Sequence, residues 1–159
     1  MKIIRDRPRT VNVEKFLARP LFAHLSTASP EGPRESPVWF LWEEEALWIL
    51  ASRTTDTFPI RIERDPRCAI GIVDFDQTSG RVQHVGFRGR AAIEPFDANR
   101  ARRLLSRYLG HDEPSWDERF RRTLEGLDQQ LLVRFVPDTA VARDVSYEVA
   151  GRGQTSPSG

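Results

Sequence analysis

The stretch that decides the fold is residues 21–52, LFAHLSTASPEGPRESPVWFLWEEEALWILAS. Three apolar runs within it have the length of strands, and they cover residues 21–28, 35–42 and 46–52. The first two are joined by a turn rich in Pro and Gly, and the second and third by three glutamates. Because connections this short can join only strands that run in opposite directions, the stretch predicts antiparallel pairing of consecutive strands.

The middle run is apolar on both of its faces. Val38, Phe40 and Trp42 point one way, and Pro37, Trp39 and Leu41 point the other. A strand of this kind is buried twice, once in a barrel and once against a helix, a ligand or another subunit. Core packing, a planar aromatic cofactor and a dimer partner each explain the pattern.

The connection that follows, ASRTTDTFPIRIERDPRCAI at 51–70, leads from the third strand into a short helix and back into an apolar run. It carries four hydroxyls and several guanidiniums, from Ser52, Arg53, Thr54, Thr55, Thr57 and Arg61. Hydroxyls and backbone N–H groups beside guanidiniums suit a phosphate. A polar connection whose hydroxyls cap a helix and whose arginines are solvated explains the local pattern as well.

The rest of the chain predicts two more strands, at 68–75 and 82–93, then helices and two late strands. Asn12 caps an opening helix, Asp97 caps a helix that stops at Gly110, and residues 115–118 form a capping box for another. Pro137 separates the late strands, at 131–136 and 139–147, and Gly86 and Gly89 predict bulges or close approaches. This order indicates a mostly β (α+β), closed or nearly closed antiparallel barrel, one domain over residues 1–150, with a disordered tail at 151–159.

Composition limits the classes of partner and compartment. The 159 residues are 39% hydrophobic and 30% charged, with 24 basic and 23 acidic side chains, so the net charge is +1. Near-neutrality argues against a nucleic-acid partner. No apolar window is long enough to span a membrane, and the charged N-terminus does not resemble a signal peptide, so we expect a cytoplasmic protein without a membrane partner.

No group of residues predicts a catalytic triad or a metal site. The single cysteine, Cys68, excludes an internal disulfide and is expected to be a buried strand residue. His24, His84 and His111 are far apart and lack metal-ligand spacing. Because no nucleophile with a base is visible, catalytic residues stay unassigned, and any chemistry is expected to come from a bound cofactor.

Taken together, these segments resemble the pyridoxamine phosphate oxidase-like proteins, the flavin-binding split β-barrels. The likeness covers residues 13–147 and lies in the order of five pieces, FLARPLFAHLSTASPEGPRESPVWFLW, LWILAS, ERDPRCAIGIVD, VGFRGRAAI and LLVRFVPDTAVARDVSY. It implies an antiparallel split β-barrel that forms a homodimer. It also implies flavin mononucleotide (FMN), or a deazaflavin coenzyme, bound in two clefts at the subunit interface.

The resemblance also implies positions for the cofactor. Along the edge of the isoalloxazine ring it places Ser36, Pro37, Val38 and Trp39. At the ribityl phosphate it places residues 52–57. Facing the cofactor, from the same or the second subunit, it places Gln83, His84 and Arg88. The family's usual Arg-Lys pair is Thr57-Phe58 here and its usual Asn is Arg61. The phosphate is then held by hydroxyls of Thr54, Thr55 and Thr57 with Arg53 or Arg61, or this branch has lost flavin or uses a different ligand.

The expected function is that of a flavin-dependent oxidoreductase acting on a small organic substrate. One alternative is a deazaflavin-dependent reductase, whose polyglutamate tail would meet Arg5, Arg7 and Arg9. Another is a non-catalytic split barrel that binds a flavin or heme. Heme would need His24, His84 or His111 as its ligand.

Overall fold

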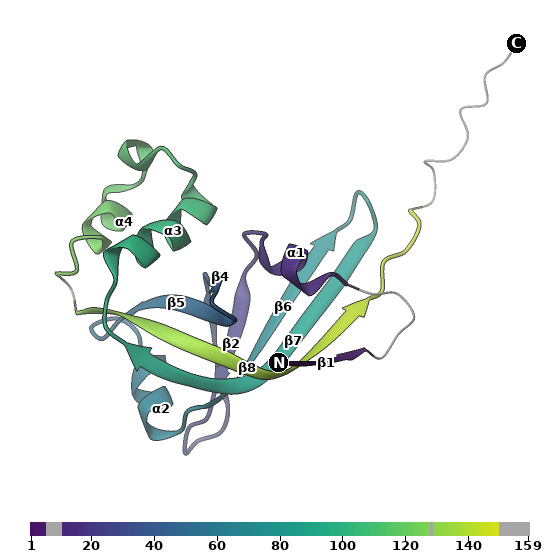
Figure 1. Cartoon of the computed structure of the whole chain (residues 1–159), viewed down its shortest axis with the longest axis horizontal. Helices are drawn as coiled ribbons and strands as arrows, with labels where there is room; N and C mark the ends of the chain where they lie inside the picture. The colour runs from purple at the N-terminus through teal and green to yellow at the C-terminus, as the bar shows by residue number, and fades with distance from the viewer. Residues whose placement is uncertain (6–10, 128, 150–159) are drawn as a thin grey trace, which may run out of the picture.

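The computed structural model describes residues 1–5, 11–127 and 129–149. Its fold is built around a single β-sheet (Figure 1). Within these ranges the strands are β1 (Lys2–Arg5), β2 (Ala23–Thr27), β3 (Arg34–Val38), β4 (Leu41–Glu43), β5 (Ala46–Ser52), β6 (Arg67–Asp76), β7 (Arg81–Glu94) and β8 (Gln130–Asp144). The helices are α1 (Val13–Leu17), α2 (Phe58–Arg64), α3 (Ala98–Leu109), the 3-10 turn η1 (Glu113–Ser115) and α4 (Glu118–Thr123).

The order of strands in the sheet is β3-β2-β6-β7-β8-β5-β4, and all neighbours along this path are antiparallel. This confirms the antiparallel split barrel with flanking helices. The short strand β1 adds to β8 in parallel, with Lys2 opposite Thr139, which the sequence pattern did not predict.

The run at 35–42 forms two strands, so the prediction of one strand in a three-strand meander was wrong. β3 pairs with β2 at one end of the sheet, and β4 pairs with β5 at the other. At the break, the Phe40 backbone N–H donates to the Tyr108 hydroxyl (3.1 Å), which itself donates to the Leu21 carbonyl (2.8 Å). A helix side chain thus replaces the strand partner at this point, and the chain crosses from one end of the sheet to the other.

The two predicted late strands are one strand, β8, which runs through Pro137. Proline has no N–H for the ladder, and the register with β7 shifts here: Thr139 lies opposite Arg88, and Pro137 lies opposite Gly89. A Cβ atom at Gly89 would lie 2.1 Å from the Val136 carbonyl oxygen, so this position needs glycine. The prediction that Gly89 marks a bulge or a close approach is confirmed.

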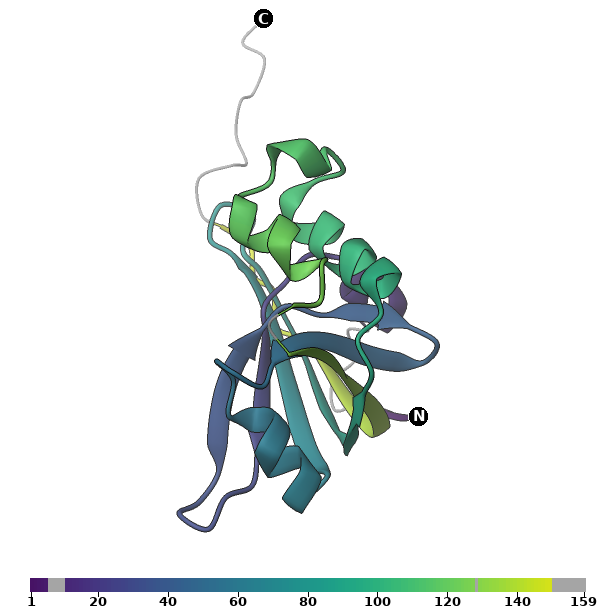
Figure 2. The same ribbon diagram turned by 90° about the vertical axis from the view of Figure 1, so that its left-hand side faces the viewer.

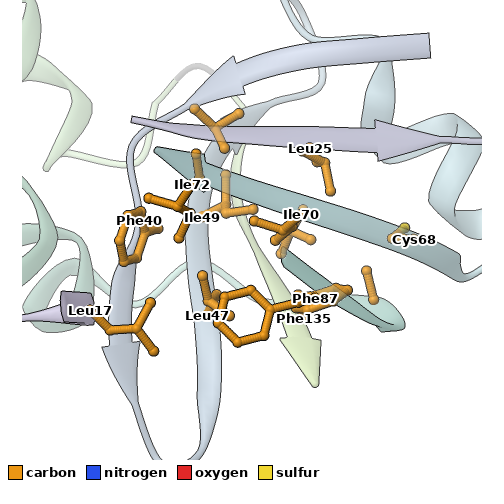
Figure 3. Close-up of a cluster of buried hydrophobic side chains, with 14 of the residues drawn as sticks. Leu17, Leu25, Phe40, Leu47, Ile49, Cys68, Ile70, Ile72, Phe87 and Phe135 are labelled. Carbon is orange, nitrogen blue, oxygen red and sulfur yellow. The ribbon is translucent and has the colours of Figure 1, made fainter. Parts of the chain in front are cut away.

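The barrel core is built from alternate strand residues, as the two-residue period requires (Figure 3). Fully buried members include Leu25, Phe40, Leu47, Ile49, Ile70, Ile72, Phe87 and Phe135. α1 adds Phe16 and Leu17, and the Asn12 side chain caps it by accepting from the Lys15 N–H (3.0 Å). Cys68 is buried as expected, and burial raises the pKa of its thiol to about 11.

A second apolar cluster lies between the barrel and the helices α3 and α4. It contains Leu41, Trp48, Leu104, Leu105 and Trp116, with Trp39 packed against it. Within the run at 37–42, Val38 and Phe40 are buried in the barrel and a helix layer covers Trp39 and Leu41, whereas Pro37 is exposed. Asp97 caps α3 and the helix stops at Gly110, as predicted. The predicted capping box at 115–118 was wrong, because Ser115 ends the η1 turn and Asp117 caps α4.

No helix among the described residues is long and apolar enough to cross a membrane. The tail at 151–159, together with Arg7 and Arg9, lies outside the described residues, so the predictions for them stay predictions.

Candidate functional site

A pocket of about 1090 Å³ opens where the barrel edge, the turn before α2 and the helices α3 and α4 meet. Figure 2 shows α2 and the paired α3 and α4 at opposite ends of this region, with β5 between them. The lining residues are Phe22, Ser36, Pro37, Val38, Trp39, Leu50, Ala51, Ser52, Thr54, Thr55, Asp56, Thr57, Phe58, Leu104, Leu105, Arg119, Phe120, Thr123 and Gln130. The volume is at the upper limit of the range of roughly 300–1,000 Å³ that is usual for ligand sites.

One wall of the pocket is the edge of the sheet. β3 is the last strand of the path, and within the described sheet no strand pairs with its second edge. The predicted quartet Ser36, Pro37, Val38 and Trp39 lies together in this wall. An open strand edge offers backbone N–H and C=O groups, which suit the polar rim of a planar ring.

The hydroxyl-rich turn forms one end of the pocket. Its conformation is held locally: the Asp56 carboxylate accepts from the Ser52 N–H (2.8 Å), and the Ser52 and Thr54 hydroxyls are 2.7 Å apart. Thr54, Thr55 and Thr57 line the pocket beside them. Residues 52–57 were predicted to lie at the phosphate, and the four of them that carry hydroxyls line the pocket.

Arg61 lies directly behind this end. Its Nε donates to the Thr27 hydroxyl (2.7 Å), and its Nη1 donates to the Thr57 hydroxyl (2.8 Å). Burial lowers the pKa of Arg61, and the positive charge of nearby Arg34 lowers it further. No carboxylate in the described ranges forms an ion pair with Arg61. An anion at the hydroxyl end would therefore supply the counter-charge that this guanidinium lacks.

The other predicted cation of the segment, Arg53, does not line the pocket. Its guanidinium forms an ion pair with Glu63 of α2, and both side chains are exposed. The hydrogen bond from Arg53 lowers the pKa of Glu63. Of the two arginines considered for the phosphate, Arg61 therefore contacts the hydroxyl turn, whereas Arg53 forms an ion pair at the surface.

Gln83, His84 and Arg88 on β7 are not in this pocket. Val85 and Phe87 point into the barrel core, so His84 and Arg88 lie on the opposite, outer face of the sheet. Gln83 points the other way and its amide donates to Asp144 (3.0 Å). Within one chain, these three residues are separate from the other predicted site residues.

The helical end of the pocket was missed by reasoning from the sequence. Trp39 stacks on Tyr108 with ring centroids 4.5 Å apart and on Phe120 at 5.4 Å. Leu104, Leu105, Arg119 and Thr123 complete this wall. The periodicity of the helices identified their apolar faces, but no local pattern indicated that those faces reach a pocket as well as the core.

The comparisons with known proteins agree on one family of folds. A family model described as pyridoxamine 5′-phosphate oxidase matches residues 10–139. No curated protein sequence matches the chain.

Three solved structures are similar over most of the chain. A conserved hypothetical protein from Mycobacterium tuberculosis has a TM-score of 0.69 at 18% identity, covering 92% of this chain and 96% of that one. A protein described as an F420 reductase has a TM-score of 0.60 at 27% identity, covering 83% and 98%. A FAD-binding protein from Mesorhizobium loti has a TM-score of 0.58 at 15% identity, covering 86% and 95%.

Proposed function

We propose that this chain, which belongs to the pyridoxamine 5′-phosphate oxidase family, is a flavin-dependent oxidoreductase that binds FMN in the pocket beside β3. One observation carries the proposal. The open edge of β3 and the hydroxyl end backed by Arg61 are two walls of a single pocket. A planar ring with a phosphate on a chain needs these two environments together.

The residues present fit that cofactor by their chemistry. Backbone groups of residues 36–39 would meet the polar rim of the ring, and the hydroxyls of Thr54, Thr55 and Thr57 would donate to the phosphate. Arg61 would add charge through its position behind Thr57. When bound, the flavin supplies the hydride or electron transfer, and the chain supplies binding, orientation and the exclusion of water.

No side chain in the pocket is assigned as an acid or base. Asp56, the carboxylate in the lining, accepts from the Ser52 N–H and holds the turn. Trp39, Leu50 and Phe120 give the pocket apolar walls. These features support a role of the protein in binding and shielding the cofactor, with the substrate as the other reactant.

We further propose a homodimer that places the cofactor at the subunit interface. The outer face of the sheet exposes the apolar side chains Val73 (51%), Phe75 (60%) and Val136 (40%). Exposed apolar residues on one face are typical of a surface that binds another protein. His84 and Arg88 lie on this face, so pairing through it would bring them to the flavin of the other subunit.

A deazaflavin is the second candidate cofactor. The F420 reductase is 27% identical to this chain, and the likeness covers 98% of that protein. F420 would use the same β3 edge for its ring. Parallel titrations with FMN and F420, followed by quenching of cofactor fluorescence, would decide between them by the tighter dissociation constant.

The experiment that tests the proposal is an absorption spectrum of the freshly purified protein. We expect a yellow protein that releases flavin when it is denatured, or a colourless one that takes up added FMN with quenching of its fluorescence. Bound flavin that no nicotinamide donor reduces would favour a non-catalytic carrier. Protein that binds neither FMN nor F420 would contradict the proposed function.

A further inference from the structure

The pocket has a second end, beyond the ring edge and the phosphate site of the proposed cofactor. This helical end lies at α3 and α4, opposite the hydroxyl turn at α2 (Figure 2). Its lining is aromatic and aliphatic, from Phe22, Trp39, Leu104, Leu105 and Phe120. The pocket, of about 1090 Å³, includes this end together with the β3 edge and the hydroxyl turn, so a ligand at the helical end would lie beside the cofactor.

Arg119 is the one basic side chain in the described lining of the pocket. Its guanidinium lies over the ring of Phe120, 4.6 Å from the centroid, and Phe120 in turn stacks on Trp39. This stack holds the cation at the helical end. Asp56, the acidic lining residue, belongs to the turn before α2, so among the lining residues the acidic and the basic side chain lie at opposite ends of the pocket.

Arg119 has no carboxylate at hydrogen-bond distance among the described residues. Its nearest acid, Asp117, has Oδ1 3.9 Å from Nε, and both side chains are mostly exposed, at 75% and 62%. An exposed pair at this distance contributes little, and its geometry leaves the guanidinium able to bind another anion. The planar fork of an arginine can bind a carboxylate through two parallel hydrogen bonds.

We infer that the helical end binds the substrate and that Arg119 selects planar organic carboxylates. The aromatic wall would contact the flat body of the molecule, and Arg119 would pair with its carboxylate. This inference rests on the proposed function, because it assigns the β3 edge and the hydroxyl turn to the flavin and the remaining volume to the substrate. Arg119 is thus a specificity-determining residue outside the family's cofactor site.

The test uses 2-naphthoate and its neutral analogue 2-naphthamide as probes, titrated calorimetrically into the full-length protein with and without FMN. We expect the parent to bind 2-naphthoate about fivefold more tightly than 2-naphthamide. Arg119→Gln should abolish this preference. Arg122→Gln is the matched control, since Arg122 is exposed on the same helix and is not in the pocket lining, and it should keep the preference.

Three results would overturn the inference: a preference retained in Arg119→Gln, a parent that binds neither probe, or competition between 2-naphthoate and FMN. FMN affinity should be equal in the parent and in Arg119→Gln. A parent that fails to bind FMN counts against the proposed function alone, because the preference for the carboxylate is also measured without the cofactor.

Discussion

Arg61 shows how much of the site depends on a single side chain. It joins the β2 strand, through Thr27, to the hydroxyl turn, through Thr57. Thr27 is itself 2% exposed, so its hydroxyl depends on this network for hydrogen bonds. The guanidinium is therefore fixed in direction before any ligand arrives, which lowers the entropic cost of binding an anion.

We predict that Arg61→Gln weakens FMN binding by about tenfold, because the phosphate loses a nearby positive charge and the Thr57 hydroxyl loses the hydrogen bond that orients it. Riboflavin, which lacks the phosphate, should bind the parent and the variant equally. Arg64→Gln, at an exposed position of the same helix, serves as the control and should leave both affinities unchanged.

Thr55→Ala and Thr57→Ala should weaken FMN binding to a smaller degree. Flavin fluorescence titrations give all of these constants, and equal losses for FMN and riboflavin would refute the assignment of Arg61 to the phosphate.

The sequence predicted those residues of the pocket that are neighbours along the chain. The hydroxyls of the turn and the quartet at 36–39 are contiguous, so their patterns were visible. Thr27 and Arg119 were not predicted, because they reach the site only through the β2 strand and the α4 helix. Their roles depend on tertiary packing, which no local pattern contains.

Strands were predicted well where buried and exposed residues alternate along the sequence. Their first and last residues were predicted wrongly where contacts with residues distant in sequence determine the backbone conformation. The break at Trp39 and Phe40 depends on Tyr108, which is 68 residues away from Phe40. In β8, the chain continues past Pro137 because Gly89 on the neighbouring strand allows the close approach. Both features come from partners distant in sequence, so local propensity could not predict them.

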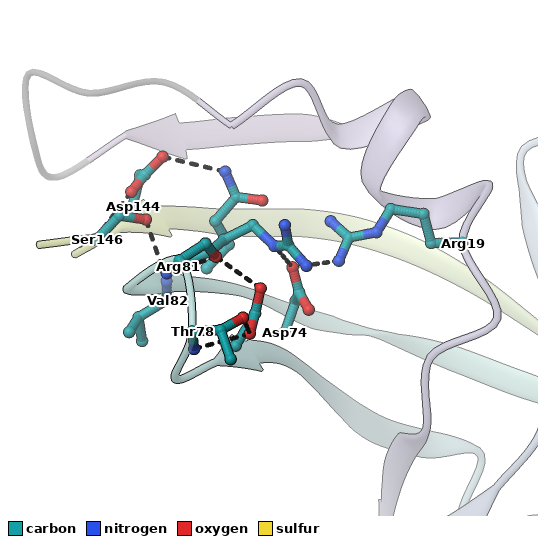
Figure 4. A network of polar contacts seen from close by, with 10 residues as sticks. Arg19, Asp74, Thr78, Arg81, Val82, Asp144 and Ser146 are labelled. Atoms are coloured by element: carbon teal, nitrogen blue, oxygen red, sulfur yellow. Dashed lines mark hydrogen bonds and ion pairs between the residues drawn. The ribbon is translucent and has the colours of Figure 1, made fainter. Parts of the chain in front are cut away.

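Asp74 links three of these elements. Its carboxylate, 6% exposed as a residue, forms ion pairs with Arg19, which follows α1, and with Arg81 at the start of β7 (Figure 4). Burial raises the pKa of Asp74, but the hydrogen bonds from Arg19 and Arg81 outweigh burial and hold the pKa below its usual value. The ionised carboxylate therefore stabilises the connection of α1 to the β6–β7 hairpin.

We predict that Asp74→Asn lowers the free energy of unfolding by about 2–3 kcal/mol at pH 7. Because the folded-state pKa is depressed, the contribution is complete above the unfolded value of 3.8 and is lost as the pH falls through the lower folded value. The difference between parent and variant should therefore shrink as the pH falls below about 3.8. Urea unfolding from pH 7 to pH 3 measures it, with Glu31→Gln, an 85% exposed side chain in a weak pair, as the control. A difference independent of pH would contradict this account.

At the scale of the whole molecule, the pocket exists because the barrel does not close through its last strand. Among the described strands none pairs with the second edge of β3, the turn before α2 closes one end of the pocket, and the helices α3 and α4 cover the other. The outer face of the sheet carries the remaining predicted residues, His84 and Arg88, away from this pocket. Their contribution to a flavin therefore requires a second copy of the chain.

A crystal structure of the protein with FMN would show directly whether the pocket beside β3 is the flavin site. We expect the flavin ring along residues 36–39 at the β3 edge, and the phosphate within hydrogen-bond distance of the hydroxyls of Thr54, Thr55 and Thr57. We also expect a dimer in which His84 of the partner subunit lies near the ring. A flavin bound elsewhere on the chain, or crystals grown with excess FMN that contain none, would contradict the proposed flavin site.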